Sequence, residues 1–131
     1  MMLYDSPTCS VEWLEEGKIL LKTMKGFVFG DETRKLFNAG YEKVLKEGGS
    51  KWLSDNRNLK PWKQEDVAFI NEDWLPRMLK AGWKYWAIIE PEDTMGNLSM
   101  KNFIDLYQEQ GLELKFFHNL EDAKAWLESL P

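Results

Sequence analysis

The chain has 131 residues and a net charge of −5 at pH 7, with 44% hydrophobic and 30% charged residues. This length and balance predict one globular domain over residues 1–131 and argue against a largely disordered chain. The acidic balance, without any basic run, argues against nucleic acid and against an anionic membrane surface as partners.

The first seven residues lack the basic start and the apolar run of a signal peptide. No apolar run approaches the roughly 20 residues that a membrane-spanning helix needs. The sequence therefore predicts a cytoplasmic protein without a membrane partner. The single cysteine, Cys9, excludes an internal disulfide, and we expect it to be a small packed residue.

A β-hairpin is predicted near the start of the chain. Residues 8–14 alternate, with Cys9, Val11 and Trp13 on one face, and residues 18–25 form the second strand. The connection between the two strands ends in Gly17, which accepts the positive φ that a tight turn requires.

Helical and extended patterns alternate after the hairpin. In chain order we expect a helix over residues 31–47, a strand over 51–55, a helix over 64–81, a strand over 83–90, a helix from Asn97 or Ser99 to Gly111, a strand over 112–117 and a helix that Asn119 caps. Pro76 predicts a kink or a split near residues 73–75, because proline cannot donate to the residue four positions back. The order ββαβαβαβα predicts an α/β fold with a mostly parallel, five-stranded sheet and right-handed crossovers.

Residues expected beyond the carboxyl ends of the parallel strands are the candidates for a ligand or partner site, because open α/β sheets bind ligands there. They are Ser54, Asp55, Asn56, Arg57, Trp62 and His118. The guanidinium of Arg57 suits a carboxylate or phosphate group. The alternative is that Asp55 and Arg57 pair with each other and order the loop. His118, the only histidine, is a candidate acid or base, and the alternative is an exposed residue beside a helix cap.

The sequence contains no strong motif of known chemistry. It has no Gly-x-Ser-x-Gly elbow, and residues 26–30 lack the spacing of a phosphate-binding loop. The carboxylates Glu90, Glu92 and Asp93 match no known metal-binding loop. We therefore expect neither a metal nor a cofactor.

Seven tryptophans are the unusual feature of the composition. They form either a core of large rings or the wall of a ligand pocket or dimer face. The candidates for a pocket wall are Trp13, Phe29, Trp52, Trp62, Trp74 and Trp86.

Residues 52–57, 73–76 and 82–87, together with the order of elements, resemble the STAS domain of anti-sigma-factor antagonists. The similarity is greater to small bacterial STAS-like proteins related in fold to CRAL-TRIO lipid-transfer domains. The resemblance covers nearly the whole chain and implies a protein-interaction module. Members of the STAS family are often switched by phosphorylation of a Ser or Thr at the start of the helix after the third strand. Residues 63–66 contain no hydroxyl at that place, so the switch is not implied here.

Three functions follow as hypotheses. The first is a non-enzymatic regulatory or protein-interaction module of the STAS-like type, with a homodimer through an aromatic face as one expected assembly. Reversing Arg57 to Glu is then expected to weaken capture of a protein partner. The second is a carrier of an apolar small molecule or lipid in a pocket lined by aromatic rings. The third is an enzyme that uses Asp55, Arg57 and His118, and it requires these three residues to converge around one cleft.

Overall fold

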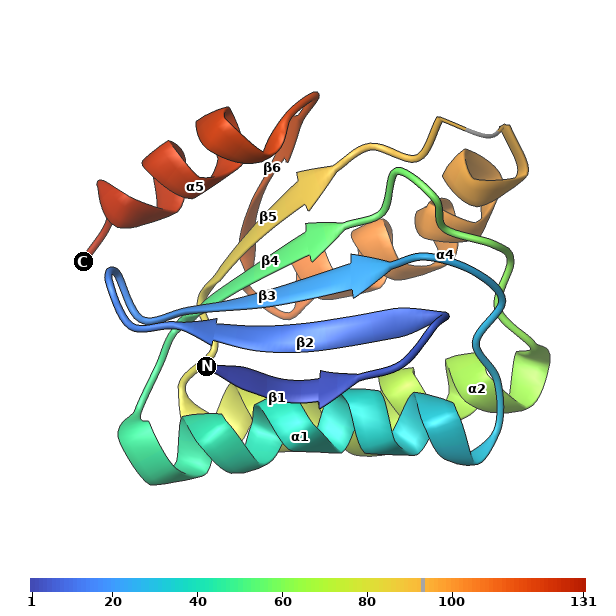
Figure 1. Cartoon of the computed structure of the whole chain (residues 1–131), viewed down its shortest axis with the longest axis horizontal. Helices are drawn as coiled ribbons and strands as arrows, with labels where there is room; N and C mark the ends of the chain where they lie inside the picture. The colour runs from blue at the N-terminus through green and yellow to red at the C-terminus, as the bar shows by residue number, and fades with distance from the viewer. Residues whose placement is uncertain (93) are drawn as a thin grey trace.

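A computed structural model describes residues 1–92 and 94–131, with the side chains of residues 94–99 and 102 left out of the description. Its strands are β1 (Met2–Asp5), β2 (Cys9–Leu14), β3 (Ile19–Met24), β4 (Lys51–Asp55), β5 (Tyr85–Ile89) and β6 (Glu113–Phe117). They form one sheet in the order β1-β2-β3-β4-β5-β6 (Figure 1). The first three strands are antiparallel, and β3 to β6 run parallel. The α/β class is therefore confirmed.

The predicted hairpin is confirmed as β2 and β3, which pair from Cys9 opposite Met24 to Leu14 opposite Ile19. Gly17 has a φ of 84° in the turn, as the sequence predicts, and Lys18 follows at 52°. The two positive values match the twist of a tight hairpin turn.

The prediction of five strands is wrong, because a sixth strand, β1, pairs with β2 at the edge of the sheet. Its four residues are only half-buried or exposed, and its register is interrupted between Met2 and Tyr4. A short edge strand with such a bulge lacks the regular alternation of apolar and polar residues by which a strand is predicted from sequence.

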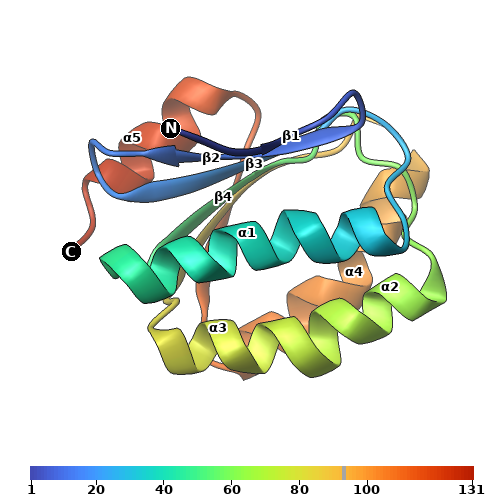
Figure 2. The ribbon, with the colours of Figure 1, turned by 60° about the horizontal axis from the view of Figure 1, so that its bottom comes forward.

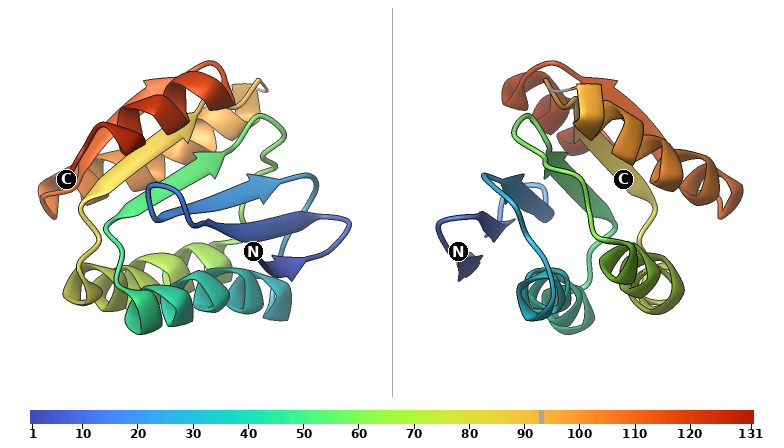
Figure 3. Two further views of the ribbon diagram at one scale, coloured as in Figure 1. Left: turned by 60° about the vertical axis from the view of Figure 1, so that its left-hand side comes forward. Right: turned by 90° about the vertical axis from the view of Figure 1, so that its right-hand side faces the viewer.

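The helical elements are α1 (Asp31–Glu47), α2 (Gln64–Phe69), the π-helical turn η1 (Ile70–Trp74), α3 (Leu75–Ala81), α4 (Thr94–Glu109) and α5 (Leu120–Glu128). Figure 2 shows α1 running beside the α2–α3 helix beneath the sheet, with α4 behind them. Parallel strands in sequential order, joined by right-handed crossovers, place every crossover helix on the same face. Helix α5 follows the last strand and packs on the opposite face (Figure 3).

The kink predicted before Pro76 takes the form of a π turn inside a continuous helix. The N–H of Leu75 donates to the carbonyl of Ile70, five residues back, instead of four. This shift of the hydrogen-bond ladder lets the chain pass into α3 without the amide that Pro76 lacks.

Helix α4 begins at Thr94, so the predicted start at Asn97 or Ser99 is wrong. The expected loop after β5 is correspondingly shorter. Asp93, one of the three carboxylates considered for a metal, lies outside the described residues.

The sheet separates two hydrophobic cores of different character. The core under α1 to α4, here called the helical face, contains the tryptophans Trp13, Trp52, Trp74, Trp83 and Trp86. The core under α5, here called the α5 face, is mainly aliphatic and is formed by Ile19, Leu53, Ala87, Ile89, Ala123 and Leu127. Alternation along each strand decides which residue enters which core.

None of the helices in the described part of the chain combines the length and apolar character that crossing a membrane demands.

Candidate functional site

A cavity lies in the helical face, between the sheet, helix α1, the π-helical turn η1 and helix α4. Its volume is about 20 Å³, the space of about one water molecule. Its lining consists of Lys22, Phe37, Trp52, Ser54, Asn56, Trp62, Ile70, Trp74, Trp83, Trp86, Met100, Phe103 and Tyr107. Ten of these thirteen residues are apolar or aromatic, so the three polar side chains among them need a separate explanation.

Strand register brings the first two of these polar side chains together. Lys22 of β3 lies directly opposite Ser54 of β4 in the parallel ladder, and both point into the helical face. Asn56 follows two residues after Ser54, just past the end of β4, and points to the same side. The polar end of the cavity is therefore near the carboxyl ends of the strands, where open α/β sheets bind ligands.

Lys22 is only 5% exposed, and within the described residues no hydrogen bond or ion pair holds its ammonium. The Nζ atom lies 5.1 Å from the ring centre of Phe37 and 5.6 Å from that of Trp62. These cation–π contacts offset part of the cost of burying a charge. Burial lowers the pKa of Lys22 to about 8, because the desolvated charged form is disfavoured.

Ser54 acts as an acceptor for two indoles at once. Trp52 Nε1 donates to its Oγ at 3.1 Å, and Trp86 Nε1 donates at 3.0 Å. Both lone pairs of the hydroxyl are then occupied, which leaves its proton as the one remaining group for hydrogen bonding. Among the described residues that proton has no acceptor.

Asn56 contributes a buried acceptor. Its amide nitrogen donates to Met100 Sδ at 3.3 Å, while its Oδ1 receives no hydrogen bond from the described residues. A buried amide oxygen without a donor costs free energy of about 1–3 kcal/mol. The three polar groups thus offer a ligand two donors and one acceptor.

The aromatic wall of the cavity is closely packed and buried except at one place. Trp52 and Trp74 meet edge to face with ring centres 5.0 Å apart, and Trp83 lies 5.3 Å from Trp74. Trp62, on the loop between β4 and α2, is the only lining residue among those described that is not buried. Trp62 is therefore the lining residue, among those described, that borders the solvent.

A glycine allows α1 to approach this wall. A Cβ atom at Gly40 would lie 2.6 Å from Cζ3 of Trp52, which real structures do not permit. The same indole donates to Ser54, so Trp52 contacts both helix α1 and the polar end of the cavity.

The candidates predicted from the sequence divide into two groups. Ser54, Asn56 and Trp62 line the cavity. Asp55 and Arg57 instead pair with each other, with Arg57 Nη2 2.7 Å from Asp55 Oδ2 and Nε 3.0 Å from Oδ1. The pair raises the pKa of Arg57, and the pairing is the loop-ordering arrangement given as the alternative.

His118 lies apart from the cavity. Its side chain is 88% exposed, and its Nδ1 is 3.7 Å from Glu90 Oε2. Within the described residues no hydrogen bond or ion pair connects His118 with Asp55 or Arg57. The convergence on which the enzyme hypothesis depends is therefore not seen.

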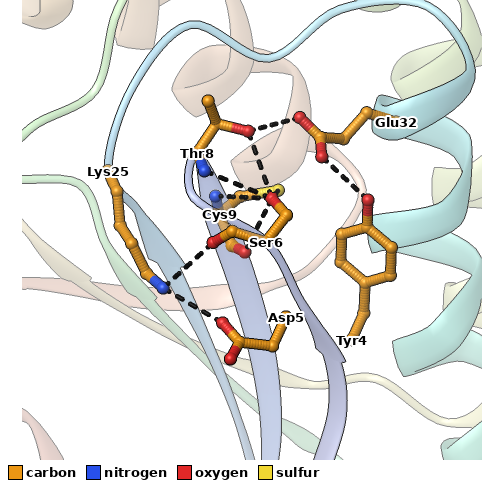
Figure 4. A network of polar contacts seen from close by, with 7 residues as sticks. All are labelled: Tyr4, Asp5, Ser6, Thr8, Cys9, Lys25 and Glu32. Carbon is orange, nitrogen blue, oxygen red and sulfur yellow. Dashed lines mark hydrogen bonds and ion pairs between the residues drawn. The ribbon is translucent and has the colours of Figure 1, made fainter.

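A second polar cluster ties the connection between β1 and β2 to α1 (Figure 4). Glu32 accepts a hydrogen bond from Thr8 Oγ1 and another from the hydroxyl of Tyr4 at 2.8 Å. Ser6 Oγ accepts from the backbone amides of Thr8 and Cys9, both at 3.2 Å. The bond from Thr8 lowers the pKa of Glu32, and burial raises the pKa of Cys9. A neutral, buried thiol in a satisfied network is a structural group.

Lys22 is the site residue that the sequence analysis missed. A usable sign was present, because Leu20, Lys22 and Met24 occupy alternate positions of β3 and share its buried face. A lysine between two core residues on such a face is rarely buried unless it is paired. Trp83 and Tyr107 also line the cavity without having been predicted, while Trp13 and Phe29 do not line it.

No group of three metal-binding side chains gathers among the described residues. A scan against protein-family models and searches of curated proteins and of solved structures found no match to this chain.

Proposed function

We propose that this chain is a small-molecule-binding module that receives its ligand in the cavity of the helical face. The observation that carries the proposal is the buried ammonium of Lys22, which has cation–π contacts but no hydrogen bond or ion pair within the described residues. A cation in such a place is costly unless it gains a partner. A ligand oxygen would supply that partner.

The polar groups indicate the chemistry of the ligand. Lys22 and the hydroxyl of Ser54 both donate, and they suit one acceptor oxygen, such as a carbonyl or carboxylate. Oδ1 of Asn56 suits a nearby hydroxyl or amine of the same ligand. The surrounding indoles favour a small, flat and otherwise apolar body.

Native mass spectrometry of gently purified protein tests the proposal, because a retained ligand appears as a mass excess. We expect an adduct that is absent from Lys22→Met and retained by Lys51→Met. Lys51 is a suitable control because it is also buried, but its Nζ donates to the carbonyl of Leu130 at 2.8 Å.

A weakly held ligand calls for a titration instead. Acetate, benzoate and benzamide are three probes with the required oxygen, and tryptophans beside the cavity report their binding by fluorescence. A response to none of the three, together with a clean mass, would contradict the proposal.

A second candidate, the STAS-like interaction module, is favoured by an exposed aromatic pair. Phe27 and Phe29, on the loop between β3 and α1, are 43% and 50% exposed, and their ring centres lie 5.3 Å apart. Exposed aromatic side chains of this kind are enriched at protein interfaces. If the pair forms a homodimer contact, replacing both residues by serine shifts sedimentation equilibrium from dimer to monomer. A monomer in both proteins rejects the dimer.

A further inference from the structure

We propose that Lys22 is a nucleophilic amine that holds a small aldehyde or ketone in the cavity as an imine. This inference rests on the proposed function, because it names the ligand class of the same cavity. It extends that function from reversible contact to a reversible covalent bond.

The amine of Lys22 has no polar partner within the described residues. The chain offers two buried lysines on adjacent strands, and they differ in their surroundings. Lys51 Nζ donates to the carbonyl of Leu130 at 2.8 Å, which occupies it. Lys22 Nζ faces the rings of Phe37 and Trp62 and has no hydrogen bond among the described residues. Its nitrogen is therefore the one of the two that can bind a carbonyl carbon.

The charge state of Lys22 also favours attack on a carbonyl carbon. Burial lowers the pKa of Lys22 to about 8, against 10.5 for an ordinary lysine. About a quarter of Lys22 amines are then uncharged at pH 7.5, compared with about one in a thousand ordinary lysines. Lysines desolvated in apolar pockets are activated nucleophiles for this reason.

The titratable groups near Lys22 do not reverse this shift. A thiolate at Cys9 of β2 would raise the pKa of Lys22, but burial raises the pKa of that thiol and disfavours the thiolate. Tyr107 of α4 lines the same cavity, and burial raises its pKa as well. Both groups are therefore neutral at the pH where Lys22 titrates.

The reaction balances without an oxidant or a reductant. The lone pair of Nζ attacks the carbonyl carbon and forms a C–N bond, while the π electrons move to the oxygen. The proton of the Ser54 hydroxyl is placed to donate a hydrogen bond to that oxygen. Both protons of the neutral amine pass to that oxygen, a C=N bond forms as the C–O bond breaks, and one water molecule leaves. A proton taken up from the solvent then converts the neutral imine into its protonated form.

The aromatic walls favour this product over other adducts of an amine. A protonated imine keeps the positive charge of lysine, so it keeps the contacts with Phe37 and Trp62. A carbamate formed with carbon dioxide would place negative charge against the same ring faces. The geometry therefore selects a carbonyl compound.

Reductive trapping of the full-length chain tests the inference. The protein is incubated at pH 7.5 with acetaldehyde and cyanoborohydride, and ethylation of each lysine is measured by peptide mass spectrometry. Lys22 is expected to react at least about 10-fold faster than Lys51 and the exposed Lys115, a cautious fraction of its advantage in uncharged amine. Its labelling rate is expected to reach half its maximum near pH 8.

The same chain unfolded in urea is the matched control, because it has the same lysines without the cavity. Selective labelling of Lys22 that disappears in urea supports the imine. Labelling no faster in the folded chain than in urea overturns it. In that case, fluorescence titration with benzoate or benzamide shows whether only the imine is wrong or whether the proposed binding function is wrong as well. A response that Lys22→Met removes leaves the binding function standing, and no response rejects both.

Discussion

The two faces of the sheet bury one lysine each, and only one of them forms a candidate site. On the α5 face, Lys51 lies beside a compact aliphatic core and donates to a backbone carbonyl. On the helical face, Lys22 lies among large rings and has cation–π contacts alone within the described residues. Burial of a charged residue is thus not by itself a sign of function. What indicates a site is a buried polar group that has no hydrogen bond or ion pair among the described residues.

The largest effect is expected on the α5 face, where packing alone is at stake. Leu53 is fully buried between β4 and α5. Leu53→Ala is expected to lower the free energy of unfolding by about 3 kcal/mol, since it removes buried methyl groups and leaves a cavity. Chemical denaturation measures the loss. The folded variant is expected to bind acetate, benzoate or benzamide as the wild type does. Loss of the fluorescence response to these probes in the folded variant would contradict the separation of the two faces.

Removal of the lysine on the helical face is expected to act in the opposite direction. The pKa of Lys22 falls from 10.5 unfolded to about 8 folded, which corresponds to a cost of about 3 kcal/mol at neutral pH. The substitution also removes the cation–π contacts of Lys22, which reduces the expected gain in stability by about 1 kcal/mol. Lys22→Met is therefore expected to raise the free energy of unfolding by about 2 kcal/mol at pH 7.

Because of Lys22, the stability of the wild-type chain is expected to depend on pH. Between pH 8 and 10.5 the unfolded chain binds more protons at Lys22 than the folded chain does, so wild-type stability rises with pH through this window. The advantage of Lys22→Met shrinks by the same amount. A variant that is less stable than wild type at pH 7 would show that Lys22 is a structural residue.

A smaller effect is expected where α1 meets the cavity wall. Gly40→Ala places a methyl group against the ring of Trp52. Overpacking of this kind costs about 1–3 kcal/mol, and alanine returns up to about 1 kcal/mol of helix propensity. We expect a net loss of about 1–2 kcal/mol in thermal or chemical unfolding, together with altered fluorescence of the cavity tryptophans. Unchanged stability and fluorescence would contradict the close packing.

The smallest effect is expected outside both cores, at Glu32. Its carboxylate accepts hydrogen bonds from Thr8 and Tyr4, and Glu32→Gln is expected to cost about 1 kcal/mol at pH 7. Because the folded pKa of Glu32 is lowered from 4.5, the stabilisation is present above that value and is lost as the pH falls below it. When unfolding is measured at decreasing pH, the free energies of unfolding of wild type and Glu32→Gln are therefore expected to converge. A difference between the two free energies of unfolding that stays constant to low pH would rule out this role of the carboxylate.

The sequence predicts the fold more completely than the site. Local patterns reveal β5, because a strand buried on both faces reads as a continuous apolar run. They do not reveal β1, whose four half-buried or exposed residues show no alternation and whose register is interrupted by a bulge. Ser54, Asn56 and Trp62 are found because they lie at the end of a predicted strand or after it. Lys22 is not found, since the rings over its ammonium, Phe37 of α1 and Trp62 of the loop before α2, come from later segments of the chain.

The central claim is that Lys22 is a buried amine without a hydrogen-bonded partner in a ligand cavity. Heteronuclear NMR titration of lysine-labelled protein, with the Lys22 resonance assigned from Lys22→Arg, measures this directly. The account predicts a titration midpoint near pH 8 that moves when a ligand occupies the cavity. A midpoint near 10.5, the value of an ordinary lysine, would show that the amine is hydrated or paired, and it would contradict the account.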